Sequence, residues 1–211
     1  MKTDDLIKAM AADHQTGVKV SDAVRLALLA GALIAGLAFF ATLGFRPDVE
    51  QAVRTARFLF KFVVTLSLAA TAAAIVLRIG RPGVPLAGWP WALAAVGLVL
   101  AAAVAVELYV TPQSAWAAKW IGTNASHCLT VIPLLSVPTL AGLLVALRRG
   151  APAHPASAGA LAGLASVGIA ATYYASNCTD DSPLFVATWY SLAAIIVVAV
   201  GAVAGARLLR W

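Results

Sequence analysis

The two cysteines are the residues of this chain best suited to chemistry. Cys128 and Cys178 are the only cysteines among 211 residues, and each adjoins a polar run. One is Thr123–His127, and the other is Thr179-Asp180-Asp181-Ser182-Pro183. Two thiols that meet can form a disulfide, and two thiolates can bind a soft metal ion such as zinc, cadmium or copper. Because the spacing matches no CxxC or Cys/His cluster, a disulfide, a metal site and an unreactive structural pair all remain open.

Other polar side chains could support this pair. His127 could add an imidazole ligand beside Cys128, and the two aspartates after Cys178 could add carboxylates. Glu107 is the one carboxylate well inside an apolar stretch, where a charge is costly unless it is paired, protonated or beside a polar cavity. It either reaches the membrane border without a function or joins the cysteines. We expect a polar layer of His127, Glu107, Asp180 and Asp181, and metal candidates Cys128, Cys178 and His127.

Composition places these residues in a membrane protein. The chain is 62% hydrophobic and 11% charged, whereas a soluble domain has about 25% charged residues. Six apolar stretches approach the roughly 20 residues needed to cross a bilayer, and no alternating β-barrel pattern occurs. We predict an all-α, polytopic bundle of six transmembrane helices embedded in the lipid bilayer. The predicted spans are about 24–45, 58–79, 90–110, 126–147, 157–176 and 184–206.

The basic residues predict the orientation. Ten of the 15 lysines and arginines fall in the N-terminal segment, the second and fourth loops and the tail. Cytoplasmic loops carry such an excess, so both termini should be cytoplasmic. Cys128 begins the fourth span and Cys178 follows the fifth, which puts both on the opposite face. In a bacterium that face is the periplasm, where disulfides persist. The basic residues form no stripe, so we expect no direct contact with nucleic acid.

Prolines and glycines distinguish three spans that could bend or pack closely. Pro133 and Pro138 interrupt the fourth span, where each removes a helical hydrogen bond and permits bending, so we predict a hinge. Gly159–Gly163 and Gly201–Gly205 are GxxxG pairs in the last two spans. These glycines predict either packing of the two spans on each other or a homodimer seam.

The N-terminal segment, residues 1–23, precedes the six-helix domain of residues 24–211. Its start has acidic residues suited to a helix N-terminus, followed by apolar residues that would share one helical side. Such a helix could dock on a cytoplasmic partner. The candidate contacts are Asp4, Asp5, Leu6, Ile7 and Met10.

Enzyme motifs are absent from the sequence. HExxH, the Walker lysine loop and GxSxG do not occur, and we therefore expect a protein that is not an enzyme. Two alternatives use the same polar layer. One is a membrane thiol- or metal-dependent oxidoreductase with Glu107 as proton acceptor, and the other is a small transporter with Glu107 in its path.

Several blocks of sequence resemble one known family across essentially the whole chain. The most specific is Cys178–Ala187 followed by Trp189-Tyr190, because Cys-x-Asp-Asp-Ser-Pro is hard to obtain from composition alone. The family is that of the NrsF-like membrane anti-sigma factors, six-span negative regulators of extracytoplasmic-function sigma factors. The other similar blocks are Met1–Ile7, Arg57–Phe62, Cys128 with Ile132–Ser136, and Leu147–Pro152.

The resemblance implies a multi-pass protein of the bacterial inner membrane that sequesters a sigma factor on the cytoplasmic side. It also implies that Cys128 and Cys178 sense heavy-metal or oxidative stress and then release the sigma factor. No obligatory cofactor is implied, although a soft metal ion could be the signal. Asn177 departs from the pattern, since many relatives have histidine before the second cysteine. Its presence weakens a four-ligand metal site and favours a redox signal.

Overall fold

Six long helices account for the apolar stretches of the chain. The computed structural model describes residues 19–79 and 88–210, and this part contains helices and connecting segments without strands. The predicted all-α fold with six membrane-spanning helices is therefore confirmed. The long helices are α2 (Val20–Thr42), α4 (Ala56–Ile79), α5 (Trp89–Val110), α7 (Ala125–Arg148), α8 (Pro155–Ala175) and α10 (Ser191–Leu208).

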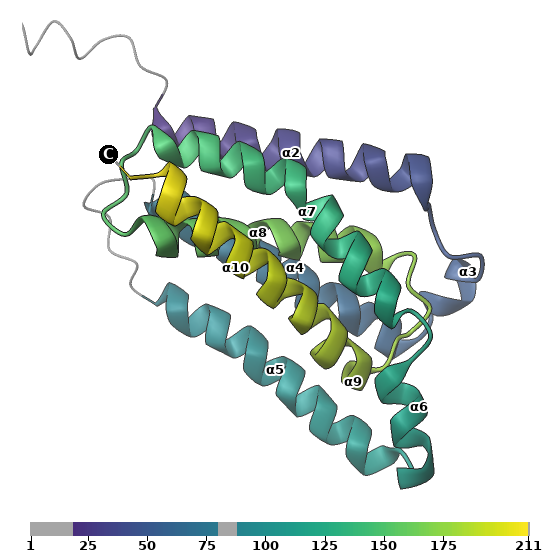
Figure 1. The fold of residues 1–211 in the computed structure, drawn as a ribbon. Coiled ribbons are helices and arrows are strands. Elements are labelled where there is room, and N and C mark those ends of the chain that lie inside the picture. Colours follow the sequence, from purple (N-terminus) through teal and green to yellow (C-terminus); the bar gives the residue numbers. More distant parts are fainter. Residues whose placement is uncertain (1–18, 80–87, 211) are drawn as a thin grey trace, which may run out of the picture.

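Short helices lie mainly at the end of the bundle opposite the C-terminus (Figure 1). The first five predicted spans lie within a few residues of the long helices, and the sixth corresponds to the continuous stretch Pro183–Leu208 formed by α9 (Pro183–Phe185), the π-helical turn η3 (Val186–Tyr190) and α10. The first span ends earlier than predicted, at Thr42, because Gly44 adopts a φ of +67° that closes the helix. The other short elements are α3 (Val49–Ala52), η2 (Gln113–Ala115) and α6 (Trp116–Ile121).

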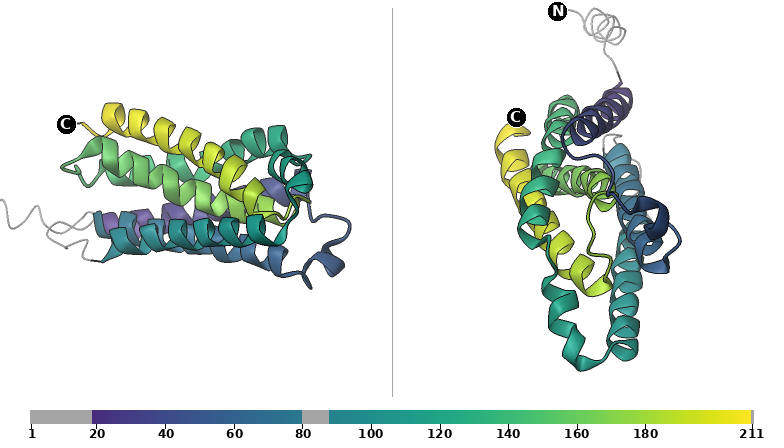
Figure 2. Two further views of the ribbon diagram at one scale, coloured as in Figure 1. Left: turned by 90° about the horizontal axis from the view of Figure 1, so that it is seen from below. Right: turned by 90° about the vertical axis from the view of Figure 1, so that its right-hand side faces the viewer.

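Helix α8 forms the centre of the bundle, with α2 and α5 at opposite edges (Figure 1; Figure 2). Small residues allow this position, because they let neighbouring helix backbones approach closely. A Cβ atom on Gly163 would lie 2.7 Å from the Val197 carbonyl oxygen of α10, and one on Gly168 would lie 2.7 Å from the Ala69 backbone of α4. Van der Waals contact between backbones thus holds α8 against both neighbours.

The GxxxG pairs lie against each other inside one chain. Gly159 faces Gly201 and Gly205, and the Gly159 and Gly201 backbones approach each other so closely that neither position has room for a Cβ atom. The predicted packing of the last two spans on each other is confirmed. Because these glycine faces are occupied within the chain, a homodimer would need a different surface.

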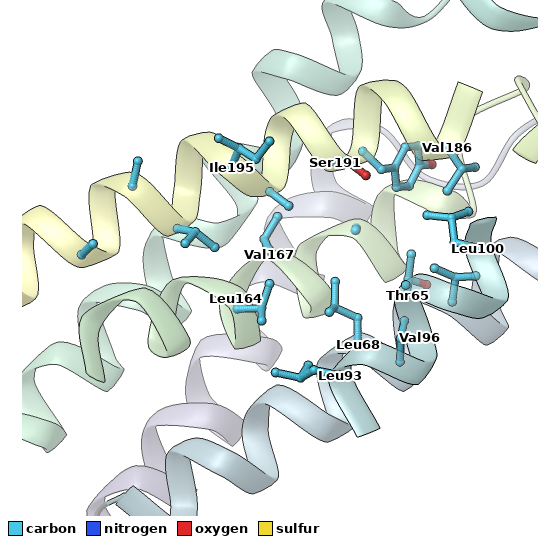
Figure 3. Close-up of a pocket in the computed structure, with 18 residues that line it drawn as sticks. Thr65, Leu68, Leu93, Val96, Leu100, Leu164, Val167, Val186, Ser191 and Ile195 are labelled. Atoms are coloured by element: carbon cyan, nitrogen blue, oxygen red, sulfur yellow. The ribbon is translucent and has the colours of Figure 1, made fainter. Parts of the chain in front are cut away.

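Helix α5 is the least embedded of the long helices. Glu107 is the one buried residue between Trp89 and Val110, although this helix contains the most apolar window of the six spans, with a hydropathy of 2.3. A groove of about 520 Å³ separates α5 from α4, α8 and α10, and aliphatic side chains such as Leu68, Leu93 and Leu164 line it (Figure 3). Such a surface fits lipid hydrocarbon better than water.

Helix α7 connects the two ends of the bundle. It runs beside α2 over its C-terminal half and diverges from α2 toward its start, near α6 (Figure 1). Pro133 and Pro138 lie inside the helix without ending it. The predicted hinge thus falls in the part of α7 between its beginning at Ala125 and its close contact with Gly31 of α2, at Thr139. Whether this part bends during function stays a prediction.

Candidate functional site: a buried thiol pair and its charged loop

The structure brings the two cysteines together. Cys128 lies in the first turn of α7, and Cys178 lies in the loop of residues 176–182, which we call the cysteine loop. Both side chains are fully buried, and both are free thiols. Cys128 lies close enough to Cys178 to affect the pKa of the Cys178 thiol.

Cys178 is the more acidic thiol of the two. The hydrogen bond from Cys128 lowers the pKa of Cys178 to about 7, and the nearby positive charge of Lys61 acts in the same direction. Burial opposes both effects because it disfavours the charged form. A thiolate is the nucleophilic and metal-binding form of cysteine. The pair thus combines a sulfur that ionises near neutral pH with a neighbour that donates to it.

Asp181 anchors the cysteine loop to the first half of the chain. Its carboxylate lies 2.6 Å from the Lys61 ammonium of α4 and 2.9 Å from the Arg46 guanidinium, which belongs to the α2–α3 connection. The Lys61 side chain is fully buried, and its Nζ also donates to the Cys178 carbonyl oxygen at 2.9 Å. Arg46 Nη1 donates to the same carbonyl oxygen at 3.3 Å. Two buried cations therefore fix the backbone of Cys178.

Arg46 also pairs with Asp48 in a two-bond arrangement. Its Nε lies 2.7 Å from Asp48 Oδ1, and its Nη2 lies 2.8 Å from Oδ2. These hydrogen bonds lower the pKa of Asp48 and raise the pKa of Arg46 above its ordinary value. The α2–α3 connection is thus held to the cysteine loop by a guanidinium that stays charged at every physiological pH.

Asp180 ties the cysteine loop to the beginning of α7. Its Oδ2 accepts hydrogen bonds from the backbone N–H of Thr123 at 2.9 Å and of Asn124 at 2.8 Å. A carboxylate at a helix N-terminus also interacts favourably with the helix dipole. Gly122, with a φ of +61°, lets the chain pass against Phe185 and Asp180, where a Cβ atom would lie 2.5 Å and 2.8 Å from their side chains.

The rest of the cysteine loop starts the sixth span. The Ser182 side chain accepts a hydrogen bond from the Leu184 N–H at 3.3 Å and caps α9, and Pro183 occupies the first helical position. Each polar residue of the Cys-x-Asp-Asp-Ser-Pro block therefore makes a structural contact. Its polar residues bind α7, α4 and the next helix in turn.

Glu107 is paired and lies apart from the thiols. Its carboxylate lies 3.0 Å from Arg57 Nε of α4 and 2.7 Å from Lys119 Nζ of α6. The residue is 4% exposed and borders a cavity of about 670 Å³ together with Thr179–Ser182 of the cysteine loop. The cavity brings Glu107 near Asp180 and Asp181, and its ion pairs hold α5 to α4 and α6.

His127 points away from the cysteine pair. It is exposed, whereas Cys128 is buried, because successive residues of a helix lie about 100° apart around its axis. Within residues 19–79 and 88–210, no group of three or more His, Cys, Asp and Glu side chains is arranged to hold a metal ion. The proposed N-terminal contacts cannot be placed, since Asp4, Asp5, Leu6, Ile7 and Met10 lie outside the described residues.

Lys61 and Arg46 were not among the predicted site residues. In the sequence both count only as topology signals, because basic residues near span ends are common. One available signal was the position of Lys61, which falls inside an apolar stretch and inside the Arg57–Phe62 block. Nothing local to Lys61 or Arg46 indicates their shared partners, Asp181 and the Cys178 carbonyl oxygen, which come from the far end of the chain.

Comparison with known proteins extends this description to a family. The sequence model of the family described as "Negative regulator of sigma F", NrsF, matches residues 10–211. This chain belongs to the NrsF family. An NrsF relative from Caulobacter vibrioides (strain NA1000 / CB15N), named anti-sigma-F factor NrsF, is 37% identical over 219 residues that cover 100% of both chains.

A second NrsF relative extends the match. The protein named probable anti-sigma-F factor NrsF, from Azospira oryzae (strain ATCC BAA-33 / DSM 13638 / PS), is 34% identical over 216 residues, again covering 100% of both chains. No solved structure matches the chain.

Proposed function

We propose that this NrsF-family protein is an anti-sigma factor of the bacterial inner membrane. It holds a sigma factor of the extracytoplasmic-function type at the cytoplasmic face and releases it when Cys128 and Cys178 react with an oxidant or a soft metal ion. The names of the two full-length relatives support the anti-sigma role. The observation that carries the sensing role is the contact between two free, buried thiols, one of which ionises near neutral pH.

The connections of the cysteine loop suggest how the signal leaves the site. Asp181 binds the loop to α4, while Asp180 and the thiol contact bind it to the start of α7. A disulfide or a bound ion changes the position of Cys128 relative to Cys178 and therefore pulls on α7. This helix extends to Arg148 at the other end of the bundle, and its two prolines allow it to bend.

The free energy needed to switch the protein between two states limits which signals can act on it. Shifting a two-state population from 1:99 to 99:1 requires a preference of roughly 5.5 kcal/mol for one state. One ordinary hydrogen bond supplies about 1 kcal/mol, which is too little. A covalent bond between the sulfurs, or an ion held by two thiolates, supplies enough.

Co-purification of the sigma factor tests this function. Wild-type protein should retain a sigma factor from its own cells and lose it after treatment with peroxide or Cd²⁺. Cys128→Ser and Cys178→Ser should retain it under both treatments. His127→Ala is the matched control, because His127 is exposed beside the pair, and it should behave as wild type. If neither wild type nor the cysteine variants retain a sigma factor, the protein is not an anti-sigma factor.

Proline substitutions test transmission separately from sensing. In Pro133→Ala and Pro138→Ala, α7 regains helical hydrogen bonds and becomes stiffer. Oxidation of the cysteines, measured by mass spectrometry, should proceed as in wild type, but less sigma factor should be released. Pro155→Ala, at the start of α8, is the control and should leave release unchanged. Unchanged release in the α7 variants would exclude the hinge.

A further inference from the structure

The apolar groove beside α5 is open to the membrane. It lies between α5 and the helices α4, α8 and α10, and its volume is about 520 Å³ (Figure 3). Ile195 of α10 lines the groove and is nevertheless 62% exposed, so the groove opens on the surface of the bundle. Thr65 also lines it, but its hydroxyl donates to the Lys61 carbonyl oxygen at 2.9 Å. The groove therefore presents hydrocarbon to a molecule that enters from the side.

The length of the groove fits one lipid chain. Its α5 wall consists of Leu93, Val96, Gly97 and Leu100, which recur at helical spacing along one side. Trp89 occupies the same side one turn earlier, at the start of the helix. From Trp89 to Leu100 the helix rises about 17 Å, at about 1.5 Å per residue. This length is close to half of the ~30 Å hydrocarbon core, which is the depth that an acyl chain reaches from its own leaflet.

The groove is too small for a helix. A helix about 17 Å long and 10–12 Å in diameter occupies on the order of 1,500 Å³, roughly three times the volume of the groove. A helix from a second copy of this chain, or from a partner protein, therefore does not fit inside it. A single unbranched hydrocarbon chain is thin enough to enter, and the bilayer supplies such chains on every side of the protein.

A positive charge lies where the polar head of such a lipid would be. Arg78, in the last turn of α4, stacks on the Trp89 ring, with its Cζ 4.9 Å from the ring centroid. In the part of the chain that the structure describes, none of the ion pairs includes Arg78. A guanidinium can bind phosphate through two parallel hydrogen bonds, and tryptophan favours the headgroup region. Arg78 and Trp89 thus complement a lipid phosphate one turn before Leu93, the first α5 residue of the groove.

We propose that the groove beside α5 binds one acyl chain of a membrane phospholipid, with the phosphate of that lipid at Arg78. The bound chain fills the space between α5 and α10 and so stabilises the position of α5 at the edge of the bundle. Ion pairs of Glu107 hold α5 near its C-terminus, and the lipid holds the part that begins at Trp89. This site is separate from the cysteine pair, and its test requires no sigma factor.

Photocrosslinking in vesicles tests the site. The full-length protein is reconstituted in vesicles of phosphatidylethanolamine and phosphatidylglycerol, in which a small fraction of the phosphatidylglycerol carries a diazirine in its acyl chain. After illumination, mass spectrometry should find crosslinks concentrated on Val96 and Ile195 of the groove, relative to Leu29 and Leu33 on the exposed side of α2. Equal crosslinking of all four residues would show only the lipid that surrounds any membrane protein and would overturn the proposal.

Gly97→Leu should fill the groove and displace the chain. Gly97 lines the groove, and nothing lies within 4 Å of its Cβ position, so leucine enters without a clash. Leucine also has a higher helix propensity than glycine, which favours a folded variant. Crosslinking of Ile195 should then be largely lost. Ala95→Leu is the matched control, because it adds the same side chain at an exposed position about 200° around the axis of α5 and should behave as wild type. Wild-type crosslinking of Ile195 in Gly97→Leu would contradict the proposal.

Arg78→Gln tests the headgroup contact. Native mass spectrometry of the protein in mild detergent, with added phosphatidylglycerol, should show one bound lipid and an affinity about tenfold lower in Arg78→Gln, the change expected for the loss of one charge-assisted hydrogen bond. Arg149→Gln, exposed after α7 at the same end of the bundle, should bind as wild type. Unchanged affinity in Arg78→Gln would overturn the assignment of the phosphate. A dimer that dissociates in Gly97→Leu would show that the groove takes a second copy instead of a lipid.

Discussion

Asp181 shows how one residue of the cysteine loop can determine the stability of the whole end of the bundle. Its carboxylate is the shared partner of Lys61, which is fully buried, and of Arg46, which is 7% exposed. Removing one partner of a buried ion pair is costly because the other charge stays buried without compensation. Asp180, one residue earlier, binds backbone N–H groups instead and has no buried cation to neutralise.

Asp181→Asn should therefore destabilise the protein strongly. We expect a loss of about 3 kcal/mol in the free energy of unfolding, the range measured for broken buried pairs. Thermal unfolding in detergent, followed by circular dichroism, measures the change. Asp22→Asn removes the exposed pair with Arg25 and should cost less than about 1 kcal/mol. Equal effects of the two variants would show that the Lys61 pair is not buried as described.

The pKa of Cys178 makes a second prediction about single residues. Because folding lowers this pKa to about 7, ionisation of Cys178 stabilises the folded state. The contribution is complete above the unfolded value of about 8.5, declines as pH falls, and is absent below about 7. The difference in unfolding midpoint between wild type and Cys178→Ser should thus grow with pH across this interval. A difference that is constant or shrinks with pH would contradict an ionised Cys178.

Single residues were only partly predictable from the sequence. The cysteines and both aspartates stand out because polar residues are rare in such a chain. Lys61 does not, since a lysine near a span end usually reaches the membrane border and serves topology. Its partner, the cysteine loop, follows 117 residues later in the chain, and that distance is visible only in three dimensions.

The most apolar of the six spans is the least buried, and the least apolar is the most buried. Helix α8 has the lowest hydropathy of the six spans, 1.3, and the largest buried share, 56%, whereas α5 has the highest, 2.3, and a buried share of 6%. Lipid is as apolar as leucine, so burial between membrane helices depends on small residues and close packing. Hydropathy alone predicts that all six segments span the membrane. The placement of α8 at the centre follows from its alanines and glycines.

The α8–α10 contact yields a prediction at the scale of helices. Gly159→Ala places a Cβ atom against the Gly201 carbonyl oxygen and the Gly205 backbone, where neither helix can give way without moving. We expect a loss of about 1–3 kcal/mol in the free energy of unfolding, as for other overpacked interiors. Gly97→Ala in α5 is the control, because nothing lies within 4 Å of its Cβ position. That variant should keep or slightly increase stability.

For the whole molecule, the even number of spans places the start of α2 and the finish of α10 at the same end, opposite the cysteines (Figure 1). The distribution of basic residues predicts that this shared end is cytoplasmic. Arg148, Arg149, Arg207 and Arg210 lie toward it, but Arg54, Arg57 and Lys119 occupy the other end. The basic residues of the second group reduce the difference in positive charge between the two ends, on which the predicted orientation rests. Two of these residues, Arg57 and Lys119, share the carboxylate of Glu107, so the three side chains together carry one positive charge instead of two.

Labelling of single cysteines tests the orientation of the molecule. In a background with Cys128→Ser and Cys178→Ser, Gln113→Cys lies at the cysteine end and Ala156→Cys at the opposite end, and both positions are exposed. A membrane-impermeant maleimide should label the first in intact cells and the second only after permeabilisation. The reverse pattern would place the thiol pair in the cytoplasm, where glutathione keeps thiols reduced, and would end the periplasmic sensing proposal.

The long separation between Lys61 and its partners also has a consequence for biosynthesis. Lys61 enters the membrane with the second span, but Asp181 and the Cys178 carbonyl are synthesised more than a hundred residues later. Until the ribosome has delivered them, the nascent protein holds a lysine in an apolar span without its counter-charge, which is an unfavourable state. We expect chains that stop before Asp181, within or directly after the fifth span, to be recognised by membrane proteases and degraded. The ion pair would then also mark a chain whose cysteine loop has been synthesised, since the ammonium becomes neutralised only when Asp181 has arrived.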